Sequence, residues 1–96
     1  MTVNLIDNKE QKQFEWQVEG HTARVEYIIA KDRIFLTHTE VPPSLEGKGI
    51  ASKLVKTVLE EVEKRSLTLV PLCPFVAMYI KRYPEWKKLV LKNINI

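Results

Sequence analysis

Residues 41–55 read Val-Pro-Pro-Ser-Leu-Glu-Gly-Lys-Gly-Ile-Ala-Ser-Lys-Leu-Val, and this stretch decides the fold. A glycine-bearing turn, Gly47-Lys48-Gly49, leads directly into an amphipathic helix. The first turn of a helix carries N–H donors without intrahelical partners, and the helix dipole adds partial positive charge there. The stretch therefore predicts a cradle for a diphosphate, to which glycine gives close access and Lys48 adds a full charge.

Upstream of this stretch, residues 14–18, 23–29 and 33–41 have the composition of β-strands. Apolar and polar residues alternate in the first two runs, and the third is rich in β-branched and aromatic types. Because the turns at 19–21 and 31–32 are short, the three strands should form an antiparallel meander. Pro42-Pro43 ends the third strand, since proline cannot donate to a sheet ladder.

Downstream, a helix is predicted over about 49–65, followed by a short apolar strand over 67–72 and a second helix over about 74–83. The apolar face of the first helix consists of Ile50, Leu54, Val55, Val58, Leu59 and Val62. Because a helix intervenes, the 67–72 strand should run parallel to the third strand. Pro74 suits a first helical turn, Pro84 ends the second helix, and residues 85–92 fit either a short helix or a strand.

The predicted order is therefore β-β-β-α-β-α, an α/β (α+β) fold with a mixed, mostly antiparallel sheet and helices packed on it. Ligands of such sheets bind beyond the carboxyl ends of the parallel strands. That edge collects Val41, the loop 47–50, Cys73 and the start of the second helix. The pattern predicts a phosphate-bearing ligand close to Cys73.

Composition narrows the class of protein. The chain has 96 residues, so residues 1–96 should form a single domain, and 45% hydrophobic with 28% charged residues is typical of soluble globular proteins. The N-terminus lacks the pattern of a secretory signal, no run is long enough to span a membrane, and a single cysteine gives no disulfide or multi-cysteine zinc site. We expect a cytoplasmic protein without a metal. The net charge of +3 does not favour a nucleic-acid partner.

Several segments together resemble a known family. Glu46-Gly47-Lys48-Gly49-Ile50-Ala51 resembles the Gln/Arg-x-x-Gly-x-Gly/Ala signature of the GNAT (Gcn5-related) N-acetyltransferases. Residues 38–42, 45–51, 70–73, 75–76 and 79–80 resemble a short GNAT-like subfamily, over most of 20–87. The resemblance implies a reduced GNAT fold and acetyl-CoA-dependent transfer of an acetyl group to a small-molecule or peptide amine. It specifies neither the acceptor nor the oligomeric state.

The resemblance also implies how coenzyme A would bind. The pantetheine arm would lie between the third strand and the 67–72 strand, with its thioester directed toward Cys73 and Tyr79. The cofactor-binding residues it implies are Val41, Gly47, Lys48, Gly49, Ile50 and Ala51. The sequence departs from the family in two ways. Glu46 replaces Gln or Arg, which implies that backbone groups dominate the phosphate contact. The early strand and two helices, which form much of the family's acceptor wall, are also missing from the predicted order.

Four residues are candidates for catalysis: Cys73, His38, Glu40 and Tyr79. Cys73 precedes a helix whose dipole would lower its pKa, so it could relay the acetyl group, or it is simply a buried cysteine. His38 and Glu40 share a strand face and could act as a general base with its orienting partner, with His38 as the proton acceptor. His38 could instead deprotonate Cys73, or both residues are solvated polar groups. Tyr79 is similar in placement to the family's thiolate-protonating tyrosine, or it packs in the core.

Other interpretations stay open at the level of sequence. Lys81, Arg82, Lys87 and Lys88 form a cationic cluster that could meet the ribose 3′-phosphate of coenzyme A, meet an acidic partner, or form a solvated face. Because helix N-termini do not discriminate between phosphates, a general nucleotide binder is one alternative. Another is a module that binds CoA or acetyl-CoA with little or no catalysis.

Overall fold

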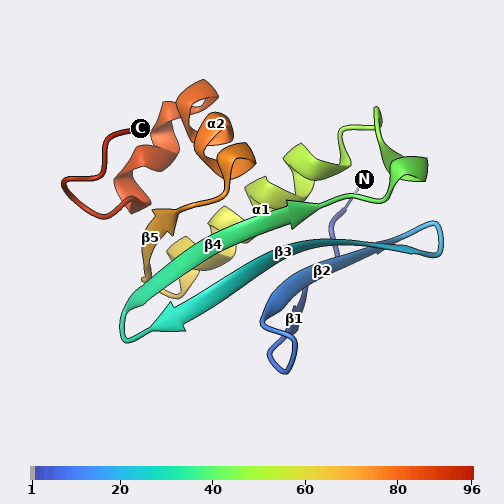
Figure 1. Cartoon of the computed structure of the whole chain (residues 1–96), viewed down its shortest axis with the longest axis horizontal. Coiled ribbons are helices and arrows are strands. Elements are labelled where there is room, and N and C mark those ends of the chain that lie inside the picture. The colour runs from blue at the N-terminus through green and yellow to red at the C-terminus, as the bar shows by residue number, and fades with distance from the viewer. Residues whose placement is uncertain (1) are drawn as a thin grey trace.

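A computed structural model describes residues 2–96, which form one five-stranded sheet with two α-helices (Figure 1). The strands are β1 (Ile6–Asn8), β2 (Gln13–Val18), β3 (His21–Ala30), β4 (Arg33–Glu40) and β5 (Thr68–Pro71). The helices are α1 (Ile50–Lys64) and α2 (Pro74–Arg82), with 3-10 turns η1 (Pro43–Leu45) and η2 (Pro84–Leu89). The strand order is β1-β2-β3-β4-β5, antiparallel up to β4 and parallel between β4 and β5. The predicted mixed sheet is confirmed.

The predicted order was wrong in one respect: a strand, β1, precedes β2, whereas no early strand was expected from the sequence. It pairs antiparallel with β2 through three residues, from Ile6 opposite Glu15 to Asn8 opposite Gln13. Three residues are too few to show an alternating pattern, so periodicity could not identify this strand. Other boundaries shift by a residue or so: β4 ends at Glu40 rather than 41, and α1 begins after Gly49.

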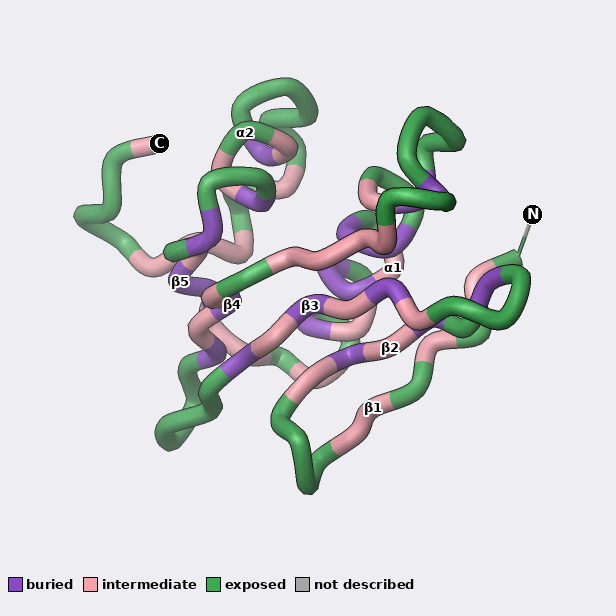
Figure 2. The backbone as a smooth tube through the Cα atoms, turned by 45° about the vertical axis from the view of Figure 1, so that its right-hand side comes forward, coloured by how far each residue is buried: buried purple, intermediate pink, exposed green. Residues whose placement is uncertain are grey.

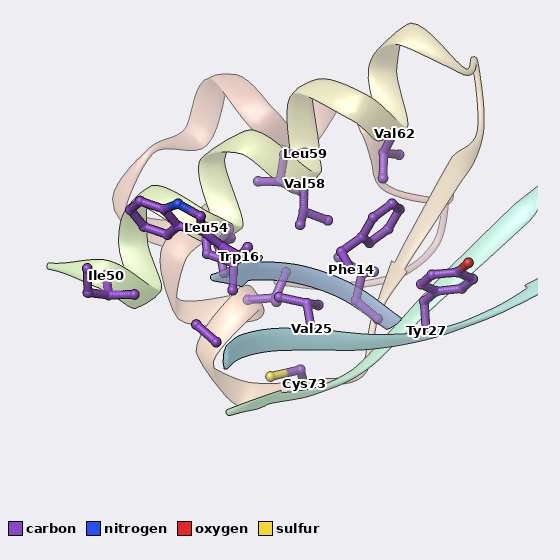
Figure 3. Packing of buried hydrophobic residues seen from close by; sticks show 14 of the residues in the cluster. Phe14, Trp16, Val25, Tyr27, Ile50, Leu54, Val58, Leu59, Val62 and Cys73 are labelled. Carbon is purple, nitrogen blue, oxygen red and sulfur yellow. The ribbon is translucent and has the colours of Figure 1, made fainter. Parts of the chain in front are cut away.

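The core lies between the sheet and α1. All six apolar residues predicted for one face of this helix are buried. Leu54, Val58 and Leu59 project from α1 toward Phe14, Trp16 and Val25 of β2 and β3 (Figure 3). Val76 and Ile80 of α2 belong to the same cluster. In Figure 2 the buried stretches accordingly line the inside of the helix–sheet layer, whereas the hairpin tips are exposed.

The segment 85–92, for which the sequence allowed a short helix or a strand, begins in a 3-10 turn and then makes a single β-bridge rather than a strand. Residues Pro84–Leu89 form the 3-10 turn η2, and Val90 then bridges in parallel to Leu69 on the outer edge of β5. The Leu91 N–H donates to the Leu69 carbonyl at 2.9 Å. The C-terminal segment therefore lies beside α2 and β5 (Figure 1). No helix within residues 2–96 has the length and apolar character needed to cross a bilayer.

A β-bulge at Thr37 changes which way β4 presents its side chains. The register passes from Tyr27 opposite Leu36 to Glu26 opposite His38, so Thr37 has no opposing residue on β3. A bulge reverses the alternation of a strand beyond it. Leu36 faces the core, whereas His38 lies beside Glu26 on the other face of the sheet.

Candidate functional site

The N-terminus of α1 is open. Gly49 is its N-cap with φ of 73°, and no side chain caps the helix. The hydrogen bonds of residues 2–96 leave the N–H groups of 49–52 without an acceptor. No acidic residue lies in the first turn. Free donors, the helix dipole and the absence of a neighbouring carboxylate within this turn make the position suitable for an anion.

A hollow of about 250 Å³ lies in front of these donors. Five of the six predicted cofactor-binding residues line it, together with Leu45, Glu46, Ser52 and Phe75; those five are Val41, Gly47, Gly49, Ile50 and Ala51. A Cβ atom added at Gly49 would meet no protein atom within 4 Å. The space in front of the loop therefore admits a ligand up to the main chain, and the residues fit a diphosphate.

Lys48 is the sixth predicted cofactor-binding residue, and it does not line this hollow. Its Nζ lies 3.1 Å from Glu19 Oε1, in the turn between β2 and β3. Both side chains of this ion pair are about half exposed, so the pair contributes little to stability and can be exchanged. The Lys48 contact to a phosphate that the sequence suggested would require Lys48 to leave Glu19.

The two parallel strands part beside the hollow. Pairing between β4 and β5 ends at Leu36 opposite Pro71, and the last link is the Cys73 N–H donating to the Leu36 carbonyl at 2.8 Å. Within the described residues, 37–40 of β4 have no strand partner on the β5 side. The main chain of β4 is therefore free to pair with an extended ligand there, as the resemblance implied.

Cys73 lies at this parting point, but it is buried. Its residue exposure is 3%, it belongs to the core cluster, and it is the N-cap of α2. Its Sγ lies 3.3 Å from Thr39 Oγ1, because Thr39 falls on the core-facing side beyond the bulge, opposite Val25. Among residues 2–96 no contact supports the proton transfer from Cys73 to His38 that the sequence suggested, since His38 lies on the other face of the sheet.

His38 and Glu40 form a close pair on that other face. Nε2 of His38 lies 2.8 Å from Oε1 of Glu40, and the side chains are 52% and 45% exposed. The predicted shared face is confirmed. The hydrogen bond from His38 holds the pKa of the Glu40 carboxyl below its ordinary value.

Tyr79 lines a second hollow, of about 110 Å³, between α1 and α2. The other lining residues are Ser52, Phe75, Met78, Arg82 and Tyr83. The ring of Tyr79 lies 4.8 Å from that of Tyr83, and burial, followed by the charges of Tyr83, Glu85 and Glu60, raises the pKa of its hydroxyl. Tyr79 is half-buried at the edge of the core.

Several residues of the site could not be identified from the sequence. Thr39 as the partner of Cys73 depends on the bulge, which leaves no local signal. Phe75 and Ser52 were also missed, although each lies within three residues of a predicted site residue, and this closeness was the one signal in the sequence. Within residues 2–96, no three His, Cys, Asp or Glu side chains gather as metal ligands would.

The fold and the site together define a small α/β domain that presents an open helix N-terminus beside two parting parallel strands. The chain belongs to the GCN5-related N-acetyltransferase family, whose sequence model matches residues 13–89. It is 33% identical over 85 residues to Protein NATD1 from Homo sapiens, covering 85% of this chain and 75% of that protein. It is 30% identical over 86 residues to Protein NATD1 from Xenopus tropicalis, covering 86% and 79%.

A solved structure shows the same fold. The solution NMR structure of a GCN5-like protein from Staphylococcus aureus superimposes with a TM-score of 0.70. The two chains are 21% identical, and the match covers 93% of this chain and 88% of the other. The reduced GNAT fold expected from the sequence is confirmed.

Proposed function

We propose that this chain is an acetyl-CoA-dependent N-acetyltransferase that acetylates an amine of a small molecule or a peptide. The main support is the open N-terminus of α1, whose free N–H groups at 49–52 meet a hollow lined by the family's signature loop. Membership of the family supports acetyl transfer as the reaction. A single free cysteine is in keeping with a cytoplasmic place of action.

The residues of the loop would hold coenzyme A through its diphosphate. The donors at 49–52 would bind phosphate oxygens, and the free edge of β4 near Val41 would pair with the amide groups of the pantetheine arm. Bound acetyl-CoA would supply an activated acetyl thioester. Because Lys48 is paired with Glu19, the backbone would provide most of the affinity.

The pair His38–Glu40 would accept the proton of the attacking amine. The lowered pKa of Glu40 keeps its carboxylate ionised, which makes it a weak base but a good acceptor for the His38 Nε2–H. That hydrogen bond leaves Nδ1 of His38 with a free lone pair. His38 is therefore assigned as the base, and Glu40 as the residue that orients it.

Tyr79 would protonate the departing thiolate, since its raised pKa keeps the hydroxyl protonated at neutral pH. Cys73 is buried and hydrogen-bonded to Thr39. This favours a role in lining the pocket of the acetyl group over a role as a covalent acetyl relay. Transfer would then run directly from the thioester to the amine.

A second candidate function is a module that binds CoA or acetyl-CoA without appreciable catalysis. It is favoured because no helix precedes β2 within residues 2–96, and because the His38–Glu40 pair is half exposed. A wall for an acceptor is therefore missing on that side, and catalysis gains most from a reactant that is held in place.

Intact mass spectrometry after mixing the protein with acetyl-CoA tests the proposal, together with thiol release in the presence of a polyamine or a lysine peptide. Retention of the cofactor under gentle conditions and amine-dependent release of CoA are expected. Glu40→Gln should lower turnover about tenfold with unchanged affinity for acetyl-CoA. Tight binding without release would establish the second candidate, and no binding at all would exclude both.

A further inference from the structure

Both helices lie on one side of the sheet, because α1 and α2 line a common hollow and share the core cluster. Figure 3 shows Phe14, Trp16 and Val25 directed to that side. The outer face of β2, β3 and β4 is turned away from the helices, and its side chains alternate with those of the core. This outer face carries Glu15, Arg24, Glu26, Ile28, His38 and Glu40.

The proposed base lies on the outer face and outside the hollows. His38 and Glu40 are about half exposed. Neither lines the hollows at the two helices, at the β3–β4 turn or near the C-terminus. Small ligands are held in concave pockets that bury most of their surface, whereas a flat face binds a partner that is large enough to contact it at several points. The position of His38 therefore favours a polypeptide acceptor over a small free amine.

An exposed apolar pair lies beside the base. Glu26 is opposite His38, and Ile28, two residues further along β3, is opposite Phe35 of β4. Residues two apart in a strand share a face and are separated by about 7 Å. Ile28 is 51% exposed, and Phe35 is half-buried. Together they offer an apolar surface to a side chain that lies about two residues from an amine at His38.

Carboxylates outnumber cations around the base. Arg24 lies between Glu15 and Glu40 in the register of the sheet, and its Nε is 3.0 Å from Glu26 Oε2. Three carboxylates against one guanidinium leave an excess of negative charge here, although the net charge of the chain is +3. Arg33 begins β4 at the far end of the strand. Because lysine side chains are charged at neutral pH, this end of the outer face attracts a segment with several lysines.

We infer that the outer face of β2–β4 docks an extended, lysine-rich segment of a protein, which presents one lysine to His38 and an apolar side chain to Ile28 and Phe35. The inference rests on the proposed function, since it identifies the acceptor of that same site. His38 lies on the stretch of β4 that has no partner on the β5 side within the described residues, so a lysine docked there reaches the parting of the two strands.

Steady-state acetylation by the full chain tests the inference with two acceptors. One is a short peptide with a central lysine, a leucine two residues away and two further lysines, and the other is n-butylamine, which has an amine on a chain of the same length. The kcat/KM should be at least about tenfold higher for the peptide.

Ile28→Ser should raise the KM of the peptide about fivefold, because half of an isoleucine side chain no longer gains from burial, and leave n-butylamine unaffected. Ile29→Ser is the matched control. Ile29 is the next residue of β3, is 42% exposed and faces the other side, opposite Ile34. It should change the kcat/KM of neither acceptor, and thermal melting checks that both variants are folded.

The charge contribution is measured in the same assay. Glu26→Gln should raise the KM of the peptide about threefold at low salt, and 0.5 M salt should remove the difference from the wild type. Glu10→Gln, at an exposed position in the turn after β1, is the control and should leave the KM unchanged.

NMR shift mapping of the labelled full chain with the peptide gives a readout that needs no turnover. Amide shifts concentrated at 24–28 and 38–40 are expected. Shifts concentrated on α2 instead would overturn the docking surface, and so would shifts of the outer face that follow the concentration of the chain alone, which would assign this face to a second copy.

The kinetic outcomes separate the docking surface from the proposed function. Equal kcat/KM for the two acceptors, or an Ile28→Ser variant that loses activity toward both alike, overturns the docking surface and leaves the proposed function intact. No transfer to either acceptor overturns the proposed function, whatever the shift mapping shows for the peptide.

Discussion

At the scale of single residues, the two properties that the loop needs from Gly49 can be measured separately. Its φ of 73° disfavours any L side chain, and the space before its Cα is open to a ligand. Gly49→Val should cost about 1–2 kcal/mol of stability through backbone strain and reduce CoA affinity by at least about tenfold. Gly20→Val is the control, because Gly20 also has a positive φ, of 77°, in the turn after β2. Equal CoA affinities of the two variants would contradict the loop assignment.

Cys73 is the second residue whose role is decided by a substitution. Its burial and its contact with Thr39 predict that Cys73→Ala loses about 1 kcal/mol in the free energy of unfolding while turnover persists. Urea unfolding and CoA release measure the two effects. Turnover that disappears in the variant, with an acetylated wild-type protein in denaturing mass spectrometry, would establish the relay instead.

At the scale of elements, one polar cluster joins β1, β3 and the end of α1. The Tyr27 hydroxyl donates to Asp7 Oδ1, and Arg65 Nη2 lies 2.9 Å from Asp7 Oδ2. Arg65 also binds Glu61 at 2.7 Å and lies 5.4 Å above the Phe14 ring. A three-residue strand has little pairing of its own, so Asp7 is what ties β1 to the helix layer.

Asp7→Ala should therefore lower the free energy of unfolding by about 2 kcal/mol, because it removes the acceptor of the Tyr27 phenol and one of the two carboxylate partners of the half-buried Arg65 guanidinium. Urea denaturation measures the change, and faster amide exchange in β1 and β2 would show where it acts. Glu10→Ala, at an exposed position in the turn after β1, should stay within about 0.5 kcal/mol of the wild type.

At the scale of the whole molecule, Tyr27 links stability to pH. Burial and the hydrogen bond to Asp7 raise the pKa of Tyr27 to about 12. Because the folded pKa lies above the ordinary value near 10, the stabilisation is complete below pH 10 and is lost as pH rises toward 12. The loss should reach roughly 2 kcal/mol. The melting temperatures of the wild type and of Tyr27→Phe, measured between pH 8 and pH 12, should converge as pH rises. A difference in melting temperature that stays constant would contradict the assignment.

The sequence predicts those features that depend on residues close together in the chain, and it misses those that depend on residues far apart. Ile50 to Val62 and the strands 14–18 and 23–29 follow from local periodicity, and each is found where it was expected. The role of Gly47 and Gly49 could be predicted because the turn before α1 needs a backbone conformation that favours glycine. The ion pair of Lys48 could not be predicted, because its partner Glu19 is brought close only by the turn after β2. The strand β1 was missed because three residues show no alternating pattern, and only their pairing with β2 identifies them as a strand.

By itself, the sequence determined the order of helices and strands from β2 to α2, the apolar face of α1 and the glycine turn that precedes it, because hydrophobic period, glycine and proline act on neighbours along the chain. Only the tertiary structure decided that His38 and Glu40 face away from Cys73, that Thr39 meets its sulfur, and that Arg82 is the one member of the cationic cluster to line the hollow between α1 and α2. Each of these depends on strand register or on the packing of two helices. Such contacts join residues far apart in the chain, and the bulge at Thr37 decides which face of the sheet His38, Thr39 and Glu40 present.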